Sequence, residues 1–152
     1  MAEYRTSMVL PTEQQRVFEY LIRPANLAEL LPDDAGVTVV EAPEILELGS
    51  RIELIVYILG IKQQIVYEVS DFEPPLFFSE RQIDGPLKSY LHEHRVEIRS
   101  ENEVELIDAI SFEPPSGLAG FVMTEKRILE NLQKGLSYRY RQIQTVMSSN
   151  GE

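Results

Sequence analysis

The chain of 152 residues contains no cysteine. This absence excludes disulfide bonds, a thiol nucleophile and cysteine-ligated zinc or iron–sulfur sites together. The sequence also has no run of about eighteen apolar residues, which argues against a membrane-spanning helix. Its first residues lack the long apolar segment of a secretory signal peptide. We therefore expect a cytoplasmic protein.

Basic residues are also scarce, since 14 Lys and Arg stand against 25 Asp and Glu and the net charge is −11. An acidic chain without a basic run repels phosphate backbones, so we expect no nucleic-acid partner. The hydrophobic share of 43% and the charged share of 26% are typical of a globular protein. The length fits one domain with a sizeable core. We expect this domain to span residues 1–148, with a frayed terminus at 149–152.

The first third of the sequence predicts a strand at residues 4–10 and then short helices. Thr12 and Gln15 have the spacing of a capping box, so we expect Thr12 to be the N-cap of the first helix. Pro24 ends this helix, and a second one is predicted at 25–31, before Pro32. Short helices after a single strand form a bent arm rather than a parallel α/β unit.

From residue 37 onward, the hydrophobic period changes to that of β-strands. Strands are predicted at 37–41, 51–59, 65–72, 76–83, 85–98 and 104–112. One long helix is then predicted over 118–147, with an apolar stripe that begins at Leu118, Phe121 and Val122. Consecutive strands with short turns form an antiparallel meander. The predicted fold class is therefore α+β, with a curved antiparallel sheet of about seven strands around a long C-terminal helix.

Several segments, spread over nearly the whole chain, resemble the START-related helix-grip superfamily, and in particular its small bacterial SRPBCC ligand-binding proteins. They are VFEYLIRPANLAELLP, GIKQQIVYEVSDFEPP, the Gly-Pro turn followed by Tyr90, His92 and His94, and LSYRYRQI. The resemblance implies a cavity between the sheet and the C-terminal helix, and a hydrophobic ligand such as a lipid, a quinone or a polyketide. Some members are cyclases or aromatases, so the resemblance implies no particular reaction.

The two histidines of the chain, His92 and His94, share the apolar face of the predicted 85–98 strand. Hairpin register places Glu80 opposite His92 and Asp108 opposite His94. A carboxylate opposite an imidazole satisfies two buried polar groups and favours the charged form of each. We therefore expect Glu80 to be the neighbour of His92, and Asp108 that of His94.

Several interpretations of this polar cluster, which also includes Gln82, remain open. The residues could merely satisfy one another, or they could orient a carbonyl or hydroxyl group of an apolar ligand. His92, His94, Asp108 or Glu80 could also act as general acid or base in a cyclase or dehydratase. A two-histidine, one-carboxylate metal site is the last alternative, although we expect no resident metal and no cofactor.

The leading hypothesis is a module that binds a hydrophobic small molecule; the alternatives are a cyclase or aromatase, and a protein that delivers a lipid or quinone or regulates a partner. The predicted ligand-contacting residues line the space between sheet and helix: Tyr67, Phe78, Glu80, Gln82, Tyr90, His92, His94, Asp108, Phe112 and Phe121.

Two surface features complete the predictions. The basic residues of the C-terminal helix, Arg139 among them, are expected on its solvated face. Apolar residues on both faces of the 51–59 strand indicate a covered outer surface, so Ile55, Tyr57 and Leu59 are candidates for a homodimer contact.

Overall fold

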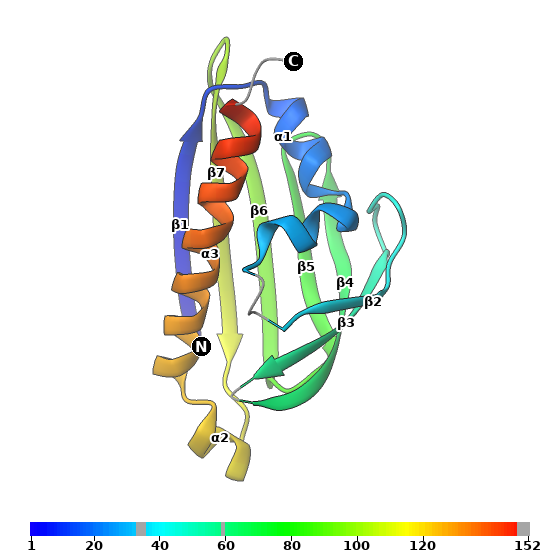
Figure 1. The fold of residues 1–152 in the computed structure, drawn as a ribbon, viewed down its shortest axis with the longest axis vertical. Helices are drawn as coiled ribbons and strands as arrows, with labels where there is room; N and C mark the ends of the chain where they lie inside the picture. Colours follow the sequence, from blue (N-terminus) through cyan, green and yellow to red (C-terminus); the bar gives the residue numbers. More distant parts are fainter. Residues whose placement is uncertain (33–35, 59, 149–152) are drawn as a thin grey trace.

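The computed structural model describes residues 1–32, 36–58 and 60–148. Antiparallel strands form one seven-stranded sheet in the order β1-β7-β6-β5-β4-β3-β2 (Figure 1). Their bounds are β1 Ala2–Leu10, β2 Thr38–Glu41, β3 Arg51–Ile58, β4 Ile61–Glu73, β5 Phe77–Asp84, β6 Ser89–Ser100 and β7 Glu103–Glu113.

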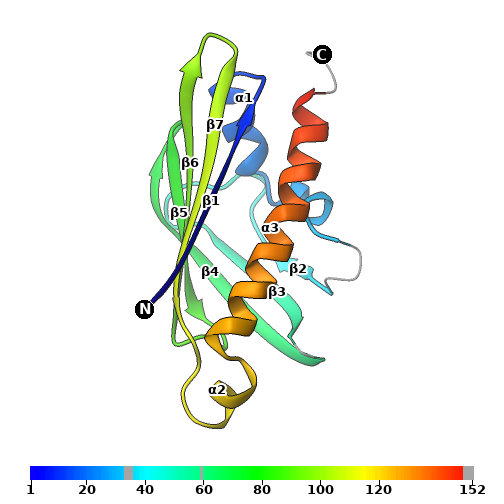
Figure 2. The ribbon, with the colours of Figure 1, turned by 90° about the vertical axis from the view of Figure 1, so that its left-hand side faces the viewer.

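Most of the helical segments lie on one face of the sheet. The short helix α1 (Gln14–Leu21) and the 3-10 helix η1 (Pro24–Leu30) follow β1, while α2 (Leu118–Val122) and the long α3 (Glu125–Ser148) follow β7. Figure 2 shows α3 lying along the concave side of the curved sheet. The predicted α+β helix-grip architecture is confirmed. None of the helices among the described residues combines the length and hydropathy needed to cross a bilayer.

The main core lies between the sheet, α1 and the C-terminal half of α3. Phe18 of α1 packs against Phe78 of β5, with ring centroids 5.6 Å apart in an edge-to-face arrangement. Ile143 of α3 is fully buried in the same cluster. Burial of these large apolar side chains fixes α1 and the end of α3 against the sheet, because each contributes about 1.5–3 kcal/mol. The other half of α3 packs in a separate, smaller cluster around Phe112 and Leu136.

The predicted capping box at the start of α1 is wrong. The N-cap is Glu13, and it makes no side-chain capping bond. Thr12 belongs to the turn after β1, where its N–H donates to the carbonyl of Leu10. Its hydroxyl accepts a bond from Arg16, and Gln15 donates to Glu19, so neither capping partner faces the other.

The predicted single helix over 118–147 is also wrong, because the chain bends between α2 and α3. Thr124 begins the second helix: its hydroxyl accepts the N–H of Arg127 at 3.3 Å, and its carbonyl accepts that of Ile128 at 3.0 Å. A capping threonine followed by an acidic first turn stabilises a new helix start. As a result, Leu118 and Phe121 are 85% and 82% exposed and do not face the sheet.

The strand predictions are confirmed with shifted ends; the largest shifts are at the starts of β4, four residues earlier than predicted, and of β6, four residues later. The predicted second helix is a 3-10 helix that ends at Leu30. The terminus at 149–152 and Leu59 of the proposed dimer contact lie outside the described residues. Of the other contact residues, Ile55 is half-buried and Tyr57 is exposed, and the homodimer stays a prediction.

Candidate functional site

Strands β5, β6 and β7 bring the predicted polar residues onto the concave face of the sheet. The predicted register is confirmed: Glu80 pairs with His92 and Phe78 with His94 between β5 and β6, while His94 pairs with Asp108 between β6 and β7. Residues two apart on a strand share a face, so both imidazoles point toward α3. Asp108 and His94 are almost completely buried.

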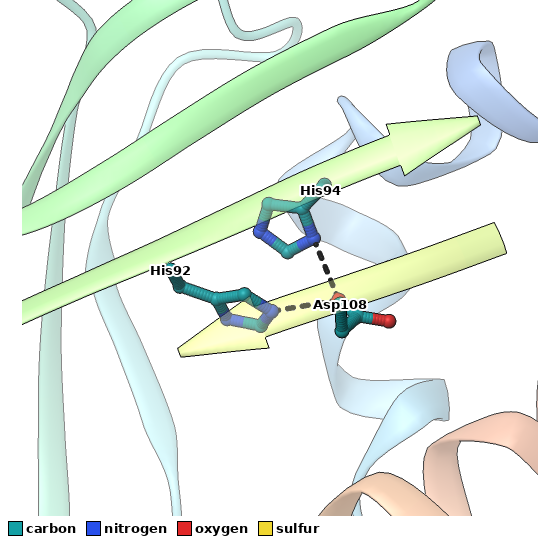
Figure 3. A group of neighbouring side chains, drawn as sticks. All are labelled: His92, His94 and Asp108. Carbon is teal, nitrogen blue, oxygen red and sulfur yellow. Dashed lines mark hydrogen bonds and ion pairs between the residues drawn. The ribbon is translucent and has the colours of Figure 1, made fainter. Parts of the chain in front are cut away.

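Figure 3 shows His92 bonded to Asp108 diagonally across β6 and β7, and His94 in contact with Asp108, its direct partner on β7. His92 Nε2 lies 2.6 Å from Asp108 Oδ1, and His94 Nε2 lies 2.7 Å from Glu80 Oε1. Glu80 and His92 are neighbours on paired strands, as predicted, but the side-chain bond of Glu80 goes to His94 instead. Diagonal neighbours on a sheet remain within reach of long side chains. His94 Nδ1 also lies 3.2 Å from Asp108 Oδ1, so the predicted contact between those residues is confirmed.

Ring stacking fixes the orientation of the imidazoles. The rings of His92 and His94 stack with centroids 3.8 Å apart, and Phe78 stacks on His94 at 4.3 Å. Tyr90 meets His92 edge-on at 6.4 Å. Because each ring is held between neighbours, the nitrogen atoms point along fixed directions.

Asp108 also connects the sheet to α3. The hydroxyl of Tyr140 donates a hydrogen bond to Asp108 Oδ2 at 2.7 Å. The carbonyl oxygen of Thr6 lies farther from this hydroxyl, at 3.1 Å. Asp108 is fully buried and accepts hydrogen bonds at both oxygens. A buried carboxylate is stable only when it is satisfied in this way.

The protonation states follow from burial and these hydrogen bonds. Burial opposes ionisation of Asp108 and Glu80, but hydrogen bonds from the imidazoles outweigh it, so the pKa of each carboxyl is lowered, that of Asp108 well below its usual range. Burial and the charge of His94 lower the pKa of His92 to about 4. Burial also opposes the charge of His94, but its bonds to Asp108 and Glu80 raise its pKa. At neutral pH, His92 is neutral and both carboxyls are ionised.

Arg139 is the residue of this site that the sequence prediction misplaced. It is half-buried and lines the cavity, with Nη2 3.4 Å from His94 Nδ1, so its assignment to the solvated face is wrong. Its spacing carried the signal: Arg139 stands three residues after Leu136 and four before Ile143, both buried. Residues at that spacing share one face of a helix.

A cavity of about 280 Å³ lies between the sheet and α3 beside this cluster. Of the predicted ligand-contacting residues, Tyr67, Glu80, Tyr90 and His92 line it. A smaller hollow of about 160 Å³ shares Tyr67 and Tyr90 with it and is also lined by Gln82. The remaining walls of the cavity are mainly apolar: Leu27, Leu31, Val37, Ile52, Leu54, Val56, Ile110, Asn131, Leu132, Gly135 and Leu136.

The other predicted contact residues lie outside the lining of both hollows. His94, Asp108, Phe78 and Phe112 are buried behind the wall, where they support the residues that line it. Phe121 is exposed on α2. A larger depression of about 760 Å³ between η1 and β2 shares Leu27, Leu31 and Val37 with the cavity but contains none of the polar cluster.

The same cluster has the donor types of a metal site. Ligand atoms of His92, His94 and Asp108 all lie within 4.8 Å of one another. However, the guanidinium of Arg139 lies 3.4 Å from His94 Nδ1, and its positive charge would repel a divalent cation there. The arrangement therefore favours a hydrogen-bond network over metal binding.

No family model and no curated protein matches this sequence. Solved structures match its fold at low identity. A protein from Chromobacterium violaceum is 14% identical, with 99% of this chain and 100% of that chain covered and a TM-score of 0.75. A major latex-like protein from Panax ginseng is 14% identical, with 97% of each chain covered and a TM-score of 0.71. A START superfamily protein from Mycobacterium smegmatis is 8% identical, with 95% and 96% covered and a TM-score of 0.72. The chain therefore shares the helix-grip fold of these solved structures.

Proposed function

We propose that this protein binds a small hydrophobic or amphipathic molecule in the cavity between the sheet and α3. The observation that carries the proposal is the cavity itself, which is about 280 Å³, mainly apolar, and polar where Glu80, His92 and Arg139 reach it. Protein interiors are normally close-packed. A largely apolar hollow with a few convergent polar groups is the usual form of a small-molecule site.

Gly135 supports this proposal from α3. It lies in the middle of the helix and lines the cavity, and a Cβ atom added there would meet nothing within 4 Å. A glycine inside a helix costs about 1 kcal/mol relative to alanine. No neighbouring side chain fills the space beside Gly135, so this space is open to a ligand.

The size of the cavity favours a compact ligand. Its volume of about 280 Å³ lies just below the range of small-molecule sites, which span about 300–1,000 Å³. Even with the adjoining hollow of about 160 Å³, the space suits a ring system better than a long-chain lipid. Of the ligand classes expected from the sequence, compact polyketide-like or quinone rings fit it best.

Binding is favoured over catalysis by the protonation of His92. This imidazole lines the cavity and is held by Asp108, as a general base would be. Its pKa of about 4, however, makes it a weak base at neutral pH, since proton transfer is most efficient when the pKa is near the working pH. Its neutral ring suits a hydrogen-bonding role toward a ligand.

The proposal is tested by filling the cavity at Gly135. The neutral, apolar fluorophore N-phenyl-1-naphthylamine is titrated against the wild type, Gly135→Phe and the matched control Gly135→Ala. We expect the wild type and the alanine variant to bind one equivalent with similar affinity, and Gly135→Phe to bind at least about tenfold more weakly because the ring occupies the cavity. Absence of binding to the wild type, or unchanged binding to a folded Gly135→Phe variant, would contradict the proposal.

A further inference from the structure

The guanidinium of Arg139 has unused hydrogen-bond donors in the wall of the cavity. Its Nε is buried without a partner, the only such side-chain nitrogen or oxygen in the part of the chain that the structure describes. Neither Glu80 nor Asp108 forms an ion pair with it, although its positive charge helps to lower the pKa of both carboxyls. The contact with His94 is long, at 3.4 Å. A buried donor without an acceptor is energetically unfavourable, and almost all buried donors in proteins are paired with one.

Two tyrosine hydroxyls add donors to the same wall. Tyr67 and Tyr90 line the cavity with ring centroids 5.4 Å apart, and neither hydroxyl has a hydrogen-bond partner among the described residues. Burial raises the pKa of both hydroxyls, so each keeps its proton at neutral pH and can donate it. The wall therefore offers a ligand more donors than its own acceptors can use.

The charges around these donors do not favour an anion. Beside the cavity, Glu80 and Asp108 contribute two negative charges, and Arg139 contributes one positive charge; the exposed Arg127 lines only the adjoining hollow. Protonation of His94 would only bring the cluster to neutrality. Because the cluster has no net positive charge, an acidic ligand would add uncompensated negative charge to a poorly solvated site.

We propose that the ligand is an uncharged ring compound with a carbonyl-type acceptor oxygen, and that Arg139 is the residue that selects this group. The inference rests on the proposed function, since it specifies the chemistry of the molecule in the same cavity. The oxygen accepts from the guanidinium, and the hydroxyls of Tyr67 and Tyr90 are placed to bind a second acceptor on the ring system.

Three bicyclic probes of similar shape test this selectivity. They are 2-acetylnaphthalene, which is neutral and carries a carbonyl; 2-isopropylnaphthalene, which has the same shape without an acceptor; and 2-naphthoate, which is an anion. Their fluorescence is read directly, because the chain has no tryptophan. We expect the ketone to bind at least about tenfold more tightly than either of the others.

Variants at Arg139 identify the donor. Arg139→Met keeps much of the side-chain volume but has no donor, so it is expected to remove the advantage of the ketone while the hydrocarbon binds within about twofold of its wild-type affinity. Arg141→Met, on the exposed side of α3, is the matched control and is expected to change neither affinity.

If a folded Arg139→Met variant still prefers the ketone, the role of Arg139 is overturned, and two results with the wild type overturn the selectivity itself. If naphthoate binds most tightly, or if ketone and hydrocarbon bind the wild type equally, the selectivity is absent while the proposed binding function stands. If none of the three probes binds, both fail. Should Arg139→Met not fold, the affinity ratios of the wild type still decide between neutral and acidic ligands.

Discussion

The imidazole of His92 is hydrogen-bonded to Asp108 across β6 and β7, although the residue opposite His92 on β7 is Ile110. The second crossed bond joins His94 to Glu80 on β5. The crossing ties three adjacent strands together by side chains, and Tyr140 extends the network to α3. The polar wall of the cavity and the position of the gripping helix are thus linked through one carboxylate.

Removal of the Asp108 carboxylate should strongly destabilise the fold. Asp108→Ala leaves His92, His94 and Tyr140 buried without their shared partner, and loss of one member of a buried, charged network costs about 3–5 kcal/mol. The free energy of unfolding is measured by urea titration. Glu113→Ala is the control, since Glu113 is only half-buried and bonds Ser89 at the end of a strand pair. Equal effects of the two substitutions would contradict the central role of Asp108.

The two histidines should titrate on opposite sides of their ordinary pKa of 6.5. Burial and the positive charge of His94 hold the pKa of His92 near 4. The contacts of His94 with Glu80 and Asp108 raise the pKa of His94. NMR spectra of the imidazole protons resolve both curves, because the chain has only two histidines. Substitution of His92 by Gln assigns them. Two curves centred together near 6.5 would show that the network is not formed in solution.

The same shifts predict how stability depends on pH. The depressed pKa of His92 contributes stability above 6.5 that is lost as the pH falls toward 4, where the unfolded chain takes up a proton and the folded chain does not. The raised pKa of His94 contributes stability below 6.5 that is lost as the pH rises through its folded value. Urea midpoints from pH 4 to 9 should therefore show less acid sensitivity in His92→Gln and less alkaline sensitivity in His94→Gln. Parallel curves for both variants and the wild type would refute these assignments.

The bend between α2 and α3 depends on the cap at Thr124. Thr124→Ala removes the hydroxyl that accepts the N–H of Arg127, and loss of such a cap costs about 1 kcal/mol. Ser137→Ala, on the exposed face of α3, provides the comparison for a change away from the cap. Thermal unfolding measures both variants. If Thr124→Ala is no less stable than Ser137→Ala, the helix does not start at this residue.

The sequence predicted backbone pairing better than side-chain partners. The alternation along β5, β6 and β7 determined which residues share the inner face, and hairpin turns set the register. The choice between direct and diagonal bonds depends on the stack of Phe78, His94 and His92, which strand parity does not describe.

Arg139 and Thr124 show two further limits of pattern reading. The charge of Arg139 suggested solvent, but its spacing matched the buried stripe. Its contact with His94 became visible only once β6 and α3 were placed together. Thr124 lies inside a continuous apolar period, so its local capping bond was outweighed by the longer pattern. The hydroxyl of Thr124 marks the start of α3, and the contact with His94 marks the position of Arg139 on the inner face of the helix.

Ligand binding is tested most directly by a crystal structure of the protein purified from its own source, with inspection of the space over Gly135. We expect density for a compact molecule between the sheet and α3, with an oxygen atom within hydrogen-bond distance of Arg139. A cavity closed by the side chains of Tyr67, Tyr90 and Leu136, with no density over Gly135, would contradict the proposed binding.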